Sequence, residues 1–280
     1  MIKDGILVQS MGFNKYLPIG HPKTTIEFIS RWNVDEIIVL DISDKKKDIS
    51  LTNGLLKLIS KNCFVPIAVG GGIQTIEHAK SLISSGADKI VLNTHAFKEN
   101  SLVTQISDQF GSQCVVGSID AKIVAPEKYR AFIENGKIDT KMNVTDWAKK
   151  LQILGAGEIF LNSIDRDGSK LGYDLKLIER VKKEIDIPLI ACGGVGKFSD
   201  FSDAVLISNA DACAAGNIFH FVEHSTILAK ANMFARGINV RLDNRASYIN
   251  RSFDSDGRLL MLEGQKLKET ILKRGSLDIL

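Results

Sequence analysis

Carboxylates and a hydroxyl follow one apolar run in the second half of the chain. The run at 157–161 has the composition of a buried strand, and it leads into Ser163, Asp165 and Asp167 before a helical pattern begins at Asp174. In a parallel α/β protein the loops after the strands carry the active site, so these side chains are candidates for catalysis or substrate binding. The alternative is a solvated turn in which Asp174 is the N-cap of the next helix.

Asp120 is the best candidate for a general acid or base. It ends a run of apolar and small residues at 114–119. Partial burial there would raise the pKa of its carboxyl toward neutrality, and the nearby Lys122 would oppose that rise. The alternative is a structural cap of the following turn. The residues expected around the same mouth, where they would position a polar substrate, are Asp41, Ser163 and Asp167.

Glycines and small polar residues follow strand-like runs at equivalent places in the two halves of the chain. They are residues 70–72 and 93–94 in the first half, and 193–194 and 216–217 in the second. Glycines there let backbone N–H groups approach an anion, and the next helix adds a favourable dipole. Tight turns also use glycine, but the duplicated placement favours one phosphate site in each half.

The rest of the chain alternates strand-like and helical patterns with short connections, which predicts a (β/α)8 TIM barrel. The expected strands are 6–10, 36–41, 65–69, 89–92, 114–119, 157–161, 188–192 and 212–215. The expected helices follow Pro22 and cover 51–62, 75–85, 101–110, a segment from about 144, 175–184, a segment after 194, and 225–236. A loop is expected through Pro18, Gly20 and Pro22, and the polar insertion 122–141 is expected to hold a hairpin around Asn135-Gly136.

An internal repeat indicates that the barrel consists of two related half-barrels. Residues 65–73 line up with 187–195 at an offset of 122. The same offset places Asp41 over Ser163 and, within one residue, 93–94 over 216–217.

Composition excludes several classes of protein. The 280 residues are 44% hydrophobic and 25% charged, with 36 basic and 33 acidic residues interspersed, so no nucleic-acid footprint is expected. Apolar runs are strand-sized and a signal region is lacking, which predicts a cytoplasmic protein outside the membrane. Cysteines and histidines are scattered along the chain, so we expect the cysteines to be reduced core residues and expect no metal and no cofactor. His220 and His224 could line a pocket mouth, but a role in packing is favoured for both.

Charged residues occupy the starts of three expected strands, at the opposite end of the barrel. They are Glu36, Lys89 and Glu158. Alternating charges at this rim usually stabilise the fold as a ring of salt bridges.

These motifs resemble the cyclase subunit of imidazole glycerol phosphate synthase, a (β/α)8 barrel of histidine biosynthesis, over about residues 2–242. The matching motifs occur in order along the chain. They are Lys3-Asp4-Gly5, Asp35-Glu36, Leu40-Asp41-Ile42, Val69-Gly70-Gly71-Gly72-Ile73, Gly86-Ala87-Asp88-Lys89, Asn93-Thr94, Phe110-Gly111-Ser112-Gln113, Ile119-Asp120-Ala121-Lys122, Gly155-Ala156-Gly157-Glu158, Ser163-Ile164-Asp165-Arg166-Asp167-Gly168, Gly172-Tyr173-Asp174, Gly193-Gly194-Val195-Gly196 and Phe219-His220-Phe221.

The resemblance implies a heterodimer in which a glutaminase docks on the N-terminal face and sends ammonia through the barrel. At the mouth, a bis-phosphorylated ribulosyl-formimino-carboxamide ribotide would be converted to imidazole glycerol phosphate and an aminoimidazole carboxamide ribotide. By this resemblance Asp120 is one of two catalytic aspartates, and Glu36, Lys89 and Glu158 form an ammonia gate. The implied substrate and phosphate residues are Asp41, Gly72, Asn93, Thr94, Ser163, Asp167, Gly168, Gly193, Gly194, Gly216 and Asn217.

Three departures from the family pattern bear on activity. Met1 stands where the second catalytic aspartate is expected, so the first strand is truncated; Gln9 replaces a phosphate-binding lysine; and 243–280 forms an extension beyond the 1–242 barrel. Leucine spacing predicts that this extension is partly helical. The departures resemble the second-copy branch of the family, associated with surface-polysaccharide (lipopolysaccharide) biosynthesis, which passes ammonia to a sugar's acetamido group and forms an acetamidino group.

Three functions therefore remain open. The histidine-pathway cyclase is favoured if upstream residues restore the first strand, and the sugar-modifying paralogue is favoured if the chain begins at Met1. A non-catalytic barrel that only docks the glutaminase is the third, and Asp120 together with the phosphate loops argues against it.

Overall fold

A parallel sheet forms the centre of the computed structural model, which describes residues 1–43, 49–61, 63–220, 224–242, 248–249 and 251–260. Hydrogen-bonded neighbours follow the order β12-β11-β10-β7-β6-β5-β4. These strands are β4 (Ile37–Leu40), β5 (Ile67–Gly70), β6 (Lys89–Leu92), β7 (Val115–Ala125), β10 (Glu158–Ser163), β11 (Leu189–Cys192) and β12 (Ala212–Cys213). The eighth strand is the stub β1 (Ile2–Lys3), in which Ile2 bridges Asp41 in parallel.

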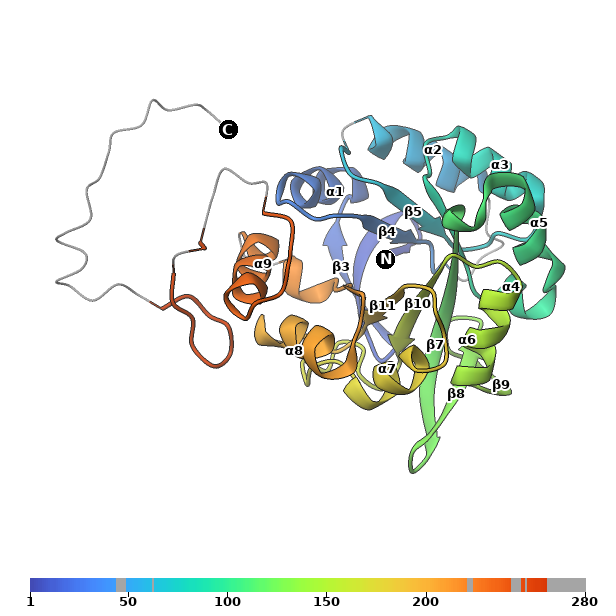
Figure 1. Cartoon of the computed structure of the whole chain (residues 1–280). Coiled ribbons are helices and arrows are strands. Elements are labelled where there is room, and N and C mark those ends of the chain that lie inside the picture. The colour runs from blue at the N-terminus through green and yellow to red at the C-terminus, as the bar shows by residue number, and fades with distance from the viewer. Residues whose placement is uncertain (44–48, 62, 221–223, 243–247, 250, 261–280) are drawn as a thin grey trace, which may run out of the picture.

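Helices surround this sheet, and the N-terminus lies near the centre of the ring (Figure 1). The predicted (β/α)8 barrel is confirmed. The helices are α1 (Pro22–Arg31), α2 (Ile49–Ser60), α3 (Ile76–Ser84), α4 (Thr94–Lys98), α5 (Ser101–Phe110), α6 (Val144–Ile153), α7 (Leu175–Lys182), α8 (Ser199–Ser208) and α9 (Ser225–Ala235), with short 3-10 helices at Ser112–Cys114 and Asn217–Phe219.

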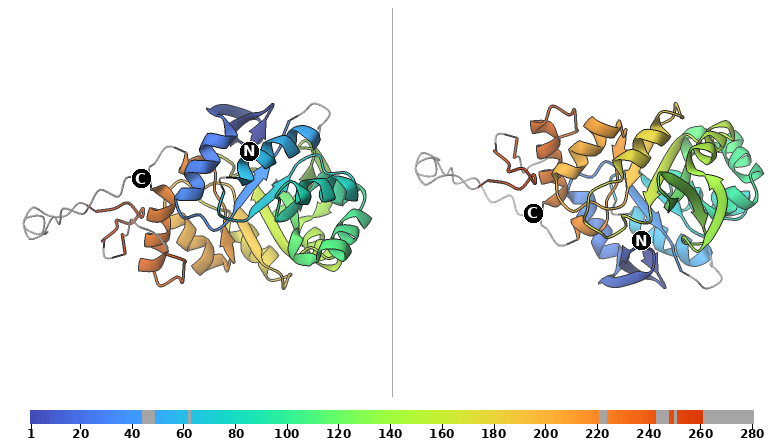
Figure 2. Two further views of the ribbon diagram at one scale, coloured as in Figure 1. Left: turned by 90° about the horizontal axis from the view of Figure 1, so that it is seen from above. Right: turned by 90° about the horizontal axis from the view of Figure 1, so that it is seen from below.

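The N-terminal segment forms its own antiparallel sheet, β1-β2-β3. The expected strand at 6–10 is β2 (Ile6–Met11), but it pairs outside the barrel. The expected loop through Pro18 and Gly20 is wrong, because these residues belong to β3 (Lys15–Gly20). Proline is tolerated there because β3 is an edge strand. In both views of Figure 2 these dark blue strands lie at the edge of the molecule, next to the N-terminus.

The strand that carries Asp120 is longer than predicted. β7 does not end at residue 119 but continues to Ala125, because its second half pairs with β8 (Lys128–Ile133). β8 in turn pairs with β9 (Ile138–Asn143), which confirms the hairpin expected around Asn135-Gly136. Asp120 therefore lies within a strand, which fixes its backbone more firmly than a loop would.

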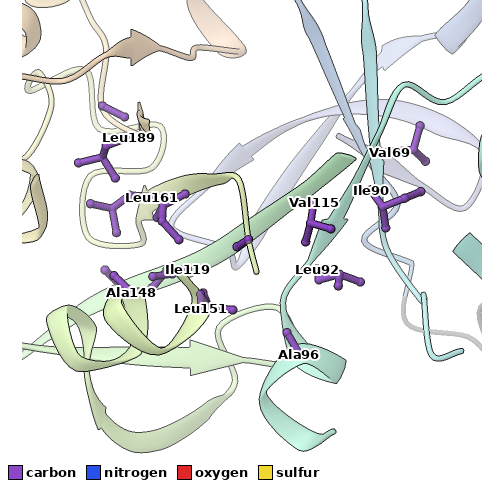
Figure 3. Close-up of a cluster of buried hydrophobic side chains, with 14 of the residues drawn as sticks. Val69, Ile90, Leu92, Ala96, Val115, Ile119, Ala148, Leu151, Leu161 and Leu189 are labelled. Carbon is purple, nitrogen blue, oxygen red and sulfur yellow. The ribbon is translucent and has the colours of Figure 1, made fainter. Parts of the chain in front are cut away.

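Two apolar layers hold the barrel together. The larger lies between sheet and helices, where Ala148 and Leu151 of α6 point toward Ile119 and Leu161 (Figure 3). The smaller cluster contains one residue from each of five strands, namely Ala68, Val91, Val116, Phe160 and Ile190. Because side chains alternate along a strand, this second layer fills the barrel interior.

The chain beyond residue 242 contacts the loop before α8. Asp256 pairs with Lys197 at 3.0 Å and accepts a hydrogen bond from the Ser199 N–H at 3.3 Å. The predicted helical content at 261–280 lies outside the described residues, whereas 251–260 contains turns and a bridge from Phe253 to Leu259.

Gly257 packs too closely on this loop to tolerate a side chain. At its φ of +78° an added Cβ would lie 2.8 Å from Ser199 N and 2.9 Å from Phe198 Cβ. We expect Gly257→Ala to lower the free energy of unfolding by about 1–3 kcal/mol through overpacking, beyond the cost of the left-handed backbone. Gly237→Ala is the control for thermal unfolding, since Gly237 has φ +81° and open space around it. Equal losses in the two variants would contradict the packing argument.

In the described part of the chain, no helix is long and apolar enough to cross a membrane. The four cysteines, which all lie within it, are unpaired, and burial raises the pKa of the Cys192 and Cys213 thiols to about 12. In the part of the chain that the structure describes, no group of three or more His, Cys, Asp or Glu side chains could hold a metal ion.

Candidate active site

Side chains alternate between the two faces of each strand, and this places several of the predicted site residues on the face that points into the barrel interior. Residues two apart share a face, so Val116, Asp120 and the residue between them, Ser118, face the interior together. On β10 the neighbour of Asp120 is Asn162, two residues beyond the interior Phe160. These polar side chains lie at the carboxyl ends of the strands, the end that carries active sites in such barrels.

A pocket of about 440 Å³ opens at this end. It brings Asp120 together with the predicted residues of the first half-barrel. The lining includes Asp41, Gly72, Asn93, Thr94, Asp120, Asn162, Ser10, Ser118, His95, Lys98, Glu134 and Lys137.

Asp120 has the properties of an acid–base group at neutral pH. It is 8% exposed, and burial raises the pKa of its carboxyl to about 7. A hydrogen bond of 2.8 Å from Asn93 Nδ2 to its Oδ2 favours the ionised form, while the negative charge of Asp167 raises the pKa further. Lys122 lies over the ring of Phe132, 5.6 Å from its centroid, so Asn93 is the neighbour that opposes the rise.

Removing the Asn93 side chain is expected to raise the pKa of Asp120 further. In Asn93→Ala the buried carboxylate loses its hydrogen-bond donor, and the protonated form becomes more favourable. A 13C NMR titration of the carboxyl carbon would show a midpoint above that of the wild-type protein. Asn100→Ala is the control, because Asn100 donates to backbone carbonyls of Ala96 and Phe97 instead. An unchanged or lower midpoint in Asn93→Ala would contradict the assignment.

Asp167 lies at the junction between the second half-barrel and the N-terminal strands. Its Oδ2 accepts hydrogen bonds from Ser10 Oγ at 2.5 Å and from the Phe13 N–H at 3.2 Å. Burial raises its pKa, and these bonds oppose the rise. Ser10 lines the pocket and Asp167 does not, so Asp167 is linked to the pocket through its hydrogen bond with Ser10.

The first-half residues form a concave wall of the pocket. Gly71 is required there, because at its φ of +108° an added Cβ would lie 2.2 Å from the Asp41 carbonyl oxygen. The Asp41 carboxylate accepts from the Ser43 N–H at 2.9 Å and from Ser43 Oγ at 2.6 Å. Gly72 and Thr94 line the same pocket.

The predicted phosphate residues of the second half do not line this pocket, and Asn217 contacts β2 instead. Asn217 Nδ2 donates to the Ser10 carbonyl at 2.8 Å, and Gln9 Nε2 donates to the Asn217 carbonyl at 3.3 Å. Gly194 has φ +104°, and an added Cβ would lie 2.2 Å from the Gly172 carbonyl oxygen. The remaining predicted residues of this half outside the pocket lining are Ser163, Gly168, Gly193 and Gly216.

Strand parity explains the position of Ser163. It is 2% exposed and shares the outward face of β10 with Ile159 and Leu161. Asp174, by contrast, caps α7 by accepting from the Leu177 N–H at 3.1 Å, as its N-cap alternative predicted.

His220 and His224 also lie outside the pocket lining. Burial lowers the pKa of His220 to about 4, and its Nδ1 has no partner among the described residues. His224 Nδ1 lies 3.0 Å from the Tyr248 hydroxyl.

A charged cluster closes the other end of the barrel interior. Lys89 Nζ lies 2.7 Å from Glu36 Oε2 and 2.8 Å from Glu158 Oε1, and the three side chains are 18–24% exposed. Burial works against the charge of Lys89, but its hydrogen bonds to the two carboxylates outweigh burial and raise its pKa. Burial raises the pKa of Glu36, whose Oε1 has no partner among the described residues.

Sequence reasoning missed several residues of the pocket. Asn162 is 5% exposed, and its Oδ1 is buried with no partner among the described residues. Counting in twos from Glu158 through Phe160 would have placed it inside the barrel. His95, Lys98, Glu134 and Lys137 carry no such signal, because their positions depend on how the hairpin turn meets α4.

The fold and site define a (β/α)8 barrel with a buried carboxyl of pKa about 7 at its mouth and a charged cluster at the opposite end. A family profile described as histidine biosynthesis protein matches residues 2–225. The chain therefore belongs to that family, and within it to the HisF-like cyclase subunits of imidazole glycerol phosphate synthase.

Three relatives illustrate the similarity. A Vibrio vulnificus (strain YJ016) protein, provisionally named imidazole glycerol phosphate synthase subunit hisF2, is 43% identical over 257 residues, 91% of this chain and 94% of that protein. The imidazole glycerol phosphate synthase subunit HisF of Hydrogenobaculum sp. (strain Y04AAS1) is 38% identical over 86% of this chain and 96% of its own. The HisF subunit of Alkaliphilus metalliredigens (strain QYMF) is 37% identical over 86% and 95%.

The hisF2 relative matches more of the chain than the two HisF subunits do. A share of 91% of 280 residues is about 255 residues, so the similarity to the hisF2 relative must extend past residue 242. The 86% covered by each HisF subunit is about 241 residues, which is no longer than the stretch 1–242.

Proposed function

We propose that this protein is the ammonia-using cyclase subunit of a glutamine amidotransferase complex. It converts a bis-phosphorylated ribulosyl-formimino-carboxamide ribotide to imidazole glycerol phosphate and an aminoimidazole carboxamide ribotide. The observation that carries the proposal is the barrel interior, where the charged cluster of Lys89 at one end and Asp120 at the other are separated by an apolar layer.

The interior suits passage of a neutral molecule. Lys89 and Val91 lie on the same face of β6, and Asn93 follows the end of the strand, so this segment runs from the charged end through the apolar layer to the mouth. Ammonia is uncharged, so its transfer into an apolar layer costs little free energy, whereas the transfer of charged ammonium costs much more. The charged cluster at the entrance would then admit ammonia from a partner and exclude bulk water.

Asp120 would perform the acid–base chemistry at the mouth. With a pKa of about 7, the carboxyl is present in both protonation states near neutral pH. As the carboxylate it can accept a proton from the nitrogen that ammonia contributes, and as the acid it can donate a proton to a departing group. Asn93 holds the Oδ2 atom in place during both steps.

We assign the two phosphates of the substrate to the two half-barrels. Gly72, Asn93 and Thr94 would bind one, since they line the open pocket with Asp41. Gly168, Gly193, Gly194, Gly216 and Asn217 would bind the other, with Ser163 and Asp167 positioning the substrate. Asn217 Nδ2 donates one of its two N–H groups to the Ser10 carbonyl, and the other can donate to a phosphate.

We place the glutaminase on the N-terminal face of the barrel. Helices run opposite to the strands, so helix ends and strand starts share this face. Large apolar side chains are exposed there: Phe64 before β5 is 85% exposed and Ile153 at the end of α6 is 83% exposed. Such side chains, around the charged cluster, suit a protein partner.

The deciding experiment supplies the purified protein with ammonium salt and the ribotide, and looks for imidazole glycerol phosphate by mass spectrometry. Product above a protein-free background supports the proposal. Absence of product from a folded protein, with either ammonium or a glutaminase and glutamine, would overturn it.

We keep as a second candidate a paralogue that passes ammonia to an N-acetylated nucleotide-linked sugar, because the name hisF2 of one relative fits a second-copy branch of the family. Gln9, in place of the expected phosphate-binding lysine, points the same way. Conversion of the acetamido group to an acetamidino group exchanges oxygen for NH, which mass spectrometry detects. No conversion of either substrate, with normal activation of a glutaminase, would indicate a docking subunit.

A further inference from the structure

We propose that Lys98 binds a phosphate of the substrate in the first half-barrel, and that Glu134 occupies Lys98 until the phosphate displaces it. The inference rests on the proposed function in one respect, that the substrate carries a phosphate ester.

Positive charge gathers at one end of the pocket. Among the described residues, the basic side chains that line the pocket are His95, Lys98 and Lys137. The first two belong to α4, and Lys137 belongs to the turn between β8 and β9. Gly72 and Thr94 line the pocket with them. A lysine ammonium in the same pocket as a threonine hydroxyl is a suitable environment for a phosphate monoester.

A carboxylate already lies against this lysine. Lys98 Nζ is 2.5 Å from Glu134 Oε1, and the side chains are 50% and 42% exposed. An ion pair this exposed contributes little to stability, so a ligand can separate it at small cost. A phosphate brings more charge and three acceptor oxygens, so it competes well with one carboxylate.

The backbone that carries Glu134 is held independently of its side chain. Glu134, Asn135 and Gly136 have consecutive positive φ values of 56°, 55° and 75°. The Glu134 N–H donates to Thr94 Oγ1 at 3.0 Å, and Asn135 Nδ2 donates to the Ile42 carbonyl at 3.1 Å. The carboxylate can therefore swing away while the turn stays in place.

The same contact prepares Thr94 to bind an anion. Its oxygen accepts the Glu134 N–H, which leaves the hydroxyl hydrogen to act as a donor. Thr94 and Lys98 belong to the same short helix and both line the pocket, so one phosphate could contact both.

The test is isothermal titration of the full chain with ribose 5-phosphate and with inorganic phosphate, in the absence of ammonia and partner. We expect Lys98→Gln to weaken binding roughly 10–100-fold, the worth of a charge-assisted hydrogen bond. We expect Glu134→Gln to tighten it about 2–5-fold, because the competing charge is gone. The control pair is Glu179→Gln in α7 and Lys183→Gln just after it, whose side chains are 2.7 Å apart and outside the pocket lining, and neither should change binding.

The opposite signs separate a ligand site from a structural ion pair. Weakening by Glu134→Gln as large as that by Lys98→Gln, in variants with wild-type thermal unfolding, would overturn the inference. So would wild-type binding in Lys98→Gln, or no binding of either probe by the wild-type protein. Binding with the expected signs but no ribotide turnover would leave this inference standing and count against the proposed function alone.

Discussion

Replacing Asp120 by asparagine is expected to lower the ammonia-dependent rate by roughly 10²–10⁴-fold, the usual contribution of a general acid–base group. Asparagine keeps the size of the side chain and an oxygen that can accept from Asn93, so the loss reports proton transfer rather than packing. In the wild-type protein the pH–rate profile should bend near pH 7, where burial places the pKa of Asp120. The bend should be absent from the residual rate of the variant.

Asp174→Asn is the matched control. Asp174 is as buried as Asp120, at 7% against 8% exposed, but it caps α7 and lies outside the pocket lining. Asparagine is also a good N-cap, so neither rate nor stability should change greatly. Full ammonia-dependent activity in Asp120→Asn would refute the catalytic assignment.

Asp120→Asn should also change the pH dependence of stability. The pKa of Asp120 rises on folding from 3.8 to about 7, so the folded state binds the proton more tightly. The resulting stabilisation is fully present below about pH 4 and is lost as pH rises through 7. At pH 8 the variant should therefore be more stable than the wild type, by at most on the order of 4 kcal/mol at about 1.36 kcal/mol per pKa unit.

Replacing Lys89 by methionine is expected to impair glutamine-dependent turnover more than ammonia-dependent turnover. The substitution leaves Glu36 and Glu158 facing each other without the cation that joins them, at 2.7 and 2.8 Å in the wild type. Under the proposed function, ammonia released by a partner passes this cluster, whereas ammonium salt in solution supplies ammonia directly at the mouth. The two rates are measured on the complex with its glutaminase.

The same variant should lose about 1–3 kcal/mol of stability at neutral pH. This is less than a fully buried pair would lose, because the three side chains retain about a fifth of their surface, 18–24% exposed. The loss should shrink as pH falls and the two carboxyls become protonated.

Lys182→Met is the control for the gate. It removes a 2.7 Å ion pair with Asp211 at the end of α7, outside the barrel interior. It should affect the two nitrogen sources equally. Equal effects of Lys89→Met on both sources would mean that the cluster only stabilises the fold.

Much of the fold follows from local pattern. Alternating strand-like and helical segments, with a repeat at an offset of 122, predicted the barrel and most of its strands. Strand boundaries were predicted wrongly where they depend on pairing with a strand that local sequence does not reveal. Pro18 indicated a loop but lies in the edge strand β3, and Asp120 seemed to end a strand that β8 extends to Ala125.

The site was predicted unevenly for the same reason. Asp120 and Asn93 could be expected at strand tips, and the structure joins them by a 2.8 Å hydrogen bond. Ser163 was expected beside them but lies on the outward face of β10, whereas its neighbour Asn162 lines the pocket. A shift of one residue changes the face, and strand parity is read reliably only against a known interior residue such as Phe160.

The sequence by itself determined where most of the barrel strands lie and that the two halves of the chain are related, because these depend on local hydrophobic periodicity and turn chemistry. Only the tertiary structure decided which end residues share a pocket. Ser10 separates Asn217 and Asp167 from the first half, and Lys98 contacts Glu134, which belongs to the turn between β8 and β9. Such contacts depend on how far each loop reaches over the barrel mouth, and residue spacing along the chain does not encode that distance.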